Sequence, residues 1–209
     1  MKDKFSTLQN KIREKITDHK ALAAHVSGMY ILGEEHKKKV AKASTVDEIF
    51  RILTKYWSFL DFSNLKNIAK NLCYDCDTEI QIKNYKEDVE DFCEHRVSEL
   101  PPGSLNNGTD MKGMDKLVIT LDLQDALLSH VLDIKEAVAN ILQIPTSTLI
   151  LHDIGKGSVV ITLWIASSLG EKLLLESSGI QRQKEKFLEA NVLSVKFKEI
   201  TIFKGNAQC

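Results

Sequence analysis

Four side chains near the middle of the chain are of the types that hold zinc. Cys73 and Cys76 form a Cys-x-x-Cys pair, and Cys93 and His95 follow it. Thiolate and imidazole groups at comparable spacings form tetrahedral zinc sites. The pattern around Cys93 and His95 predicts a helix, however, on which residues two positions apart point about 200° away from each other. That geometry closes a metal site poorly, so we expect these four residues not to bind a metal.

No other group of residues forms an enzyme signature. The Cys-x-x-Cys pair lies in a helical pattern and not in the βαβ context of a redox motif. His152-Asp153 comes at the end of a predicted strand, where such a pair is usually solvated. Gly155-Lys156-Gly157-Ser158 lacks the four-residue spacer with which a P-loop wraps phosphates. We therefore expect no catalytic residue and no cofactor.

The composition is that of an ordinary globular protein. Of the 209 residues, 43% are hydrophobic and 27% are charged. The formal net charge of −1 provides no broad positive field for nucleic acid. No apolar run reaches the length of about 18 residues that a membrane span needs, and the first residues lack the apolar stretch of a secretory signal. Four cysteines in a chain of this size fit a reducing compartment, so we expect a cytoplasmic protein.

A segment rich in proline, glycine and asparagine divides the chain. Pro101–Thr109 contains two of the three prolines, and neither a helix nor a strand should cross it. We predict a helical bundle over residues 1–100, a linker over 101–111, a second domain over 112–204 and a tail over 205–209.

Apolar residues three and four positions apart predict helices throughout the first domain. The first helix covers about Phe5–Leu32 and is divided near Asp18. Thr45-Val46-Asp47-Glu48 is a capping box that begins another helix. Asp77 is expected to cap the last helix.

The second domain reads strand, helix, strand, strand, helix, strand. Alternating apolar residues predict strands over Lys116–Leu123, Thr148–Leu151, Ser158–Ile165 and Leu193–Phe203. The longer of the two predicted helices covers Ser168–Ala190. This order is typical of a ferredoxin-like βαββαβ domain, in which two helices cover one face of a four-stranded antiparallel sheet. The predicted fold class is therefore α+β, a helical bundle followed by a ferredoxin-like domain.

Two segments resemble modules of invertebrate multidomain proteins. Tyr56–Leu65, preceded by Thr45–Phe50, resembles a helical module that accompanies death-fold, TIR or NACHT-type signalling domains. Ile154–Ile165 is similar to the end of an α/β module in the same company. The resemblance implies a scaffold in innate-immune or cell-death signalling, and the matching positions contain no catalytic residue.

The strand order is also that of the RNA-recognition motif, whose strands present aromatic rings to bases. Lys156-Gly157 matches the start of its longer signature strand, but the ring positions carry Ser158, Val160 and Leu163, and Val118 stands on the first strand. Each stacked base contributes about 1–3 kcal/mol, so the missing rings remove most of that affinity. An RNA-binding protein with an atypical surface is the alternative hypothesis.

The favoured hypothesis is a non-catalytic scaffold or adaptor that binds a protein partner, with neither nucleic acid nor membrane expected as its ligand and with the oligomeric state open. Two contact surfaces are predicted. One is the uncovered sheet face, formed by Val118, Thr120, Val160, Thr162 and Trp164. The other is an aromatic cluster of Tyr56, Trp57, Phe59 and Phe62, for which the alternative is the core of the bundle.

Overall fold

The computed structural model describes residues 1–29, 32–60, 62–100, 113–155 and 159–205. The predicted linker over 101–111, the turn at Lys156-Gly157 and the last four residues of the predicted tail lie outside this range. The chain divides into two compact units, Met1–Phe92 and Cys93–Cys209.

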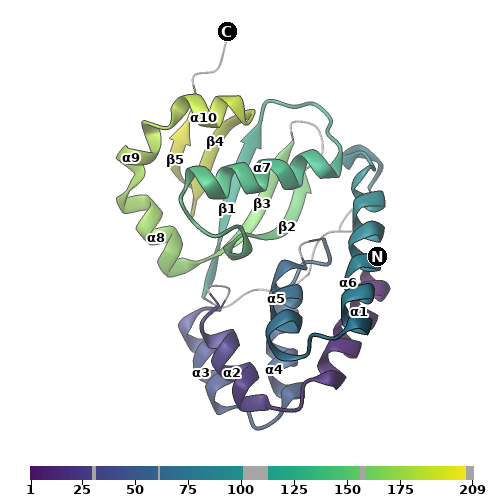
Figure 1. Cartoon of the computed structure of the whole chain (residues 1–209). Helices are drawn as coiled ribbons and strands as arrows, with labels where there is room; N and C mark the ends of the chain where they lie inside the picture. The colour runs from purple at the N-terminus through teal and green to yellow at the C-terminus, as the bar shows by residue number, and fades with distance from the viewer. Residues whose placement is uncertain (30–31, 61, 101–112, 156–158, 206–209) are drawn as a thin grey trace. The chain divides into compact units, whose positions relative to one another are not determined.

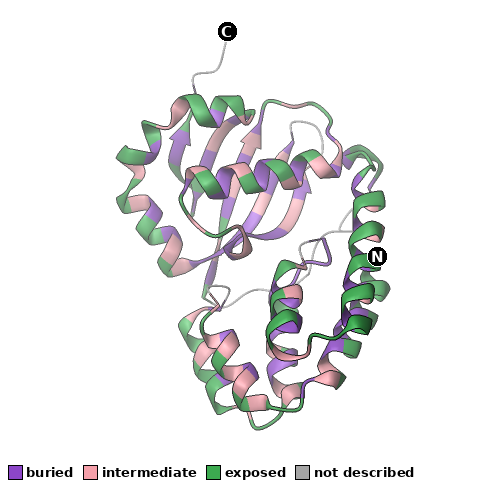
Figure 2. Ribbon diagram, in the orientation of Figure 1, coloured by how far each residue is buried: buried purple, intermediate pink, exposed green. Residues whose placement is uncertain are grey.

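The first unit is helical. Its apolar residues recur at helical spacing and are buried on the inward sides of the helices, which Figure 2 draws in purple. A short 3₁₀ turn, Thr54–Tyr56, follows the fourth helix. The helices are α1 (Lys2–Lys15), α2 (His19–Ser27), α3 (Glu34–Lys42), α4 (Val46–Leu53), α5 (Ser63–Leu72) and α6 (Cys76–Cys93) (Figure 1).

Side-chain caps decide where two of these helices begin. Asp18 separates α1 from α2, because its carboxylate accepts hydrogen bonds from the backbone N–H groups of Lys20 and Ala21. Thr45 caps α4 as predicted, and its hydroxyl accepts from the N–H of Glu48 at 3.2 Å. The Glu48 carboxylate reaches back to the N–H of Ser44, one residue earlier than a capping box requires.

The cap of α6 is Asp75 and not Asp77 as predicted. An oxygen of Asp75 accepts from the N–H of Thr78 at 2.7 Å. Lys15 of α1 donates to Asp75 at 2.9 Å and to Asp77 at 2.7 Å. The hydrogen bonds from Thr78 and from Lys15 lower the pKa of Asp75 to about 2. This network ties the end of α1 to the start of α6.

The second unit combines an antiparallel sheet with helices that cover one of its faces (Figure 1). The strand order is β2-β3-β1-β4-β5, with every neighbouring pair antiparallel. The α+β class predicted from the sequence is confirmed. The elements are β1 (Met114–Leu121), α7 (Leu128–Ile141), β2 (Ile150–Gly155), β3 (Val160–Ala166), α8 (Ser167–Leu175), α9 (Ser177–Gln181), α10 (Lys184–Glu189), β4 (Val192–Phe197) and β5 (Ile200–Lys204).

Strand β1 shows how the two faces of the sheet differ. Leu117, Ile119 and Leu121 are buried, whereas Val118 and Thr120 between them are half-buried. Leu117 pairs with Phe197 of β4, which packs under α8. The aliphatic side of β1 therefore faces the helices, and the mixed side lies on the opposite face.

Two predicted elements are subdivided in the structure. The helix predicted over Ser168–Ala190 is three short helices, α8, α9 and α10. The predicted strand Leu193–Phe203 is a hairpin of β4 and β5, turned by Lys198 and Glu199 with positive φ angles of 47° and 64°. This backbone usually selects glycine or asparagine, so the turn carries no strong sequence signal.

Within the described residues, no helix combines the length and the apolar character needed to cross a membrane.

Candidate functional site

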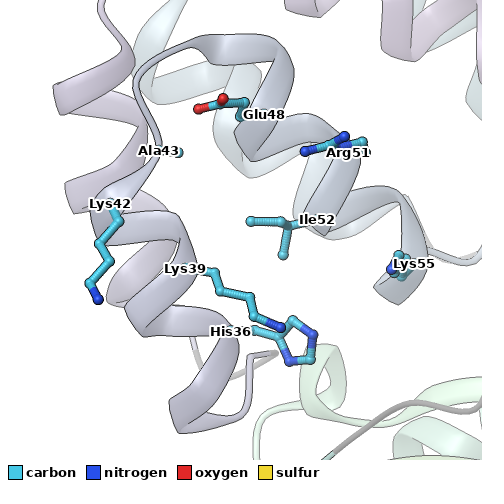
Figure 3. Close-up of a pocket in the computed structure, with 8 residues that line it drawn as sticks. All are labelled: His36, Lys39, Lys42, Ala43, Glu48, Arg51, Ile52 and Lys55. Atoms are coloured by element: carbon cyan, nitrogen blue, oxygen red, sulfur yellow. The ribbon is translucent and has the colours of Figure 1, made fainter.

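A groove in which four of the eight lining residues are lysine or arginine lies between α3 and α4 (Figure 3). Its volume is about 520 Å³. The wall from α3 and the turn after it comes from His36, Lys39, Lys42 and Ala43, and the wall from α4 and its 3₁₀ extension comes from Glu48, Arg51, Ile52 and Lys55. We call this the basic groove.

Helical spacing places these residues together. Along α4 and the 3₁₀ turn after it, the lining positions are i, i+3, i+4 and i+7, a spacing that places them on one side. The hydrophobic side of the same helix, with Ile49, Phe50 and Leu53, is buried in the core. Figure 3 shows Ile52 pointing from α4 toward α3, so the groove has an aliphatic floor between charged rims.

The charge balance of the groove is positive. Lys39, Lys42, Arg51 and Lys55 face a single carboxylate, that of Glu48. Glu48 accepts hydrogen bonds from the N–H and the hydroxyl of Ser44, and these bonds lower its pKa. The one acidic group of the groove is therefore already hydrogen-bonded to Ser44, in the loop that precedes α4.

The lysines of the groove differ in whether they already form an ion pair within the protein. Lys39 pairs with Glu35 at 3.1 Å, an i, i+4 contact along α3. Lys42 and Lys55 are exposed and form no ion pair with any residue that the structure describes. Since exposed lysines on one rim can reorient toward an anion at little cost, the groove is suited to a negatively charged ligand.

A buried histidine–tyrosine pair supports the floor of the groove. The hydroxyl of Tyr56 lies 2.6 Å from Nδ1 of His36, and the two rings meet edge to face. Tyr56 is 1% exposed and His36 is 8% exposed. Burial, with a smaller contribution from Glu35, raises the pKa of Tyr56 to about 12. Among the described residues no phenylalanine, tyrosine or tryptophan lines the groove, and the His36 ring is largely buried, so the groove offers no open aromatic face on which a base could stack.

The aromatic cluster predicted as a contact surface lies mainly in the core of the helical unit. Tyr56, Trp57 and Phe59 are buried. Trp57 packs against Phe50, and Phe59 accepts a hydrogen bond through its carbonyl from the Tyr85 hydroxyl at 2.6 Å. Phe62 is half-buried against the Tyr85 ring. The expectation that this cluster is a contact surface is therefore corrected: three of its four rings lie in the core, because large rings gain most by burial.

The predicted sheet surface is less exposed than expected at its centre. Trp164 is 8% exposed, with the His152 ring 4.9 Å away and the Lys116 ammonium 5.5 Å from its ring. Trp164 is therefore not an exposed anchor. The other members of the predicted surface, Val118, Thr120, Val160 and Thr162, are half-buried, and Val118 pairs with Thr162.

The structure separates the four residues considered for zinc. Cys76 and Cys93 are the first and last residues of α6, so they lie about 26 Å apart along the helix. No three His, Cys, Asp or Glu side chains of the described residues are grouped as metal ligands. Burial raises the pKa of the Cys73 thiol, which makes it a poor nucleophile.

The basic groove was not predicted from the sequence. The charged segment Glu34–Lys39 has the pattern of a solvated helical face. The only local signal for α4 is the i, i+4 spacing of Arg51 and Lys55 on the side away from its apolar residues.

Comparison with known proteins adds no identification: no family model, curated protein or solved structure matches this chain.

Proposed function

We propose that the protein is a non-catalytic binding module, a scaffold or adaptor, that holds an acidic segment of a cytoplasmic protein partner in the basic groove. The observation that carries this proposal is the set of four cations around a cavity whose single carboxylate is already hydrogen-bonded. The aliphatic floor at Ile52 suits a polypeptide, which combines carboxylates with apolar side chains.

Nucleic acid is the less favoured ligand. The chain as a whole is slightly negative, so the attraction for a polyanion is local to the groove. The groove also lacks an aromatic platform. RNA binding by an atypical surface remains the second hypothesis and is an outcome of the experiment below.

The fold and the sequence resemblance indicate the cellular process in which the proposed function would act. In this proposal the second unit is a ferredoxin-like domain. Its first four strands and the helices on one face of the sheet support this, and β5 is an additional strand at the edge. Thr45–Phe50, one of the segments that resembles modules of innate-immune and cell-death proteins, includes Glu48 of the groove. That overlap supports an adaptor role in such signalling.

The test measures binding to the groove directly. Fluorescence anisotropy with a labelled Glu- and Asp-rich peptide compares the wild type with the double variant Lys39→Ala, Arg51→Ala. Each exposed charge pair contributes about 0.2–1 kcal/mol, so the variant should bind about two- to thirty-fold more weakly. The matched control is Lys38→Ala with Lys70→Ala, two exposed lysines that do not line the groove.

Two further arms complete the experiment. A labelled oligouridine RNA should bind no more tightly than a neutral peptide. Preferential binding of the RNA would replace the proposal with the RNA-binding hypothesis. Equal loss of peptide affinity in the groove variant and the control would mean that net charge, and not the groove, holds the peptide.

A further inference from the structure

Three acidic residues at the carboxyl end of α6 and one in the turn that follows it form a stripe. Glu87, Glu90, Asp91 and Glu94 recur at i, i+3, i+4 and i+7 and are exposed. Lys86 pairs with Glu90 at 3.2 Å, and no ion pair to another described residue involves the other three. We call this the acidic stripe.

The stripe works against the stability of the helix that carries it. The carboxyl end of a helix is the negative end of its dipole, where acidic side chains are unfavourable and basic ones are favoured. The last turn of α6 contains no basic residue. Neighbouring carboxylates at i, i+4, such as Glu87 and Asp91, also repel each other. A cation supplied from outside the helix would relieve both effects.

We propose that the acidic segment held in the basic groove is the acidic stripe of a second copy of this chain. This inference rests on the proposed function and names its partner. Four carboxylates on the stripe meet four cations around the groove. Glu87 to Asp91 extends about 6 Å along α6, and Arg51 to Lys55 extends about 6 Å along the second wall, so the cations can reach the carboxylates from both rims.

The contact must join different molecules. In Figure 1, α3 and α6 lie on opposite sides of the helical unit with α5 between them. A molecule therefore cannot place its own stripe in its own groove. Each copy offers one groove and one stripe, so the contact is heterologous and links copies head to tail. Because the charges are exposed, the association is weak and sensitive to salt.

Sedimentation velocity on the full chain tests this geometry. The groove variant is Lys39→Glu with Arg51→Glu, and the stripe variant is Glu87→Lys with Asp91→Lys. At low salt the average mass of the wild type should increase as the protein concentration is raised from about 10 µM to 1 mM. Added salt should reverse this increase. Each variant alone should associate at least about tenfold more weakly, because attractive contacts become repulsive.

The mixture of the two variants gives the decisive measurement. The groove variant keeps an intact stripe, and the stripe variant keeps an intact groove. The altered groove is acidic and the altered stripe is basic, so both kinds of contact between the two variants are attractive. An equimolar mixture should therefore associate again, about as strongly as the wild type. The charge-matched controls are Lys38→Glu with Lys70→Glu and Glu14→Lys with Glu136→Lys, all at exposed positions outside the groove and the stripe, and they should associate as the wild type does. Circular dichroism checks that every variant keeps its helices.

The outcomes separate this inference from the proposed function. A wild type that stays monomeric but still binds the acidic peptide overturns the inference and leaves the proposed function standing. A wild type that neither binds the acidic peptide nor self-associates overturns both the inference and the proposed function. Association that survives in both variants alone also overturns the inference, since another surface then joins the copies.

Discussion

Gly170 should be intolerant of even one added methyl group. It is buried in α8, where the β-carbon of an alanine would lie 2.7 Å from Cδ2 of Phe197 and closer still to Cε2 and Cζ. Ordinary carbon–carbon contacts are about 3.5–4.0 Å, and Phe197 is fully buried, so its ring has no space into which to move. Overpacking of this kind costs about 1–3 kcal/mol, whereas alanine in a helix gains about 1 kcal/mol over glycine. We expect Gly170→Ala to destabilise the second unit by up to about 2 kcal/mol.

A second glycine provides the control. Gly179 in α9 is exposed, and a β-carbon there would contact nothing within 4 Å. Gly179→Ala should therefore stabilise by about 0.5–1 kcal/mol. Urea denaturation followed by fluorescence, in a Trp57→Phe background that leaves Trp164 as the only tryptophan, reports on the unit that holds both glycines. A Gly170→Ala variant as stable as Gly179→Ala would refute the packing argument.

Three further predictions concern single contacts. Tyr85→Phe removes the hydroxyl that donates to the Phe59 carbonyl, and should lower the free energy of unfolding by about 1–3 kcal/mol in urea denaturation; an unchanged midpoint would contradict it. Thr45→Ala removes the cap of α4 and should cost about 1 kcal/mol, whereas Thr45→Ser should be close to neutral, and equal losses would argue against capping. Burial, then Lys116, lowers the pKa of His152, so the unfolded chain binds this proton more tightly. Stability should be full above about pH 6.5 and fall as the pH drops toward the folded pKa, less steeply in His152→Gln.

The elements that sequence reasoning identified are those with strong local signals. The cap at Thr45 and the alternation of Leu117, Ile119 and Leu121 in β1 follow from side-chain chemistry within a few residues. The breaks in Ser168–Ala190 fall at Glu176 and at Arg182-Gln183, which are good helix formers, so residue type does not mark them. The hairpin at Lys198-Glu199 could not be predicted, because its positive φ angles are stabilised by strand pairing and not by residue type.

The candidate site was harder to predict than the fold. Each wall of the basic groove is an ordinary exposed helix face, and only the packing of α3 beside α4 brings Lys39 and Arg51 around one cavity. For the aromatic cluster, by contrast, a contact surface was predicted where the structure places buried side chains. Trp57 and Phe59 have the composition of a binding surface, but burial in the core is the more common fate of such rings.

The irregular pairing at both margins of the sheet bears on solubility. The outer strands β2 and β5 have six and five residues, and each is interrupted where His152 and Ile202 fall out of register with their neighbours. An incoming strand would find only a few evenly spaced backbone groups before the kink. Such margins are poor templates for amyloid-like growth, because they disfavour edge-to-edge pairing between the sheets of different copies.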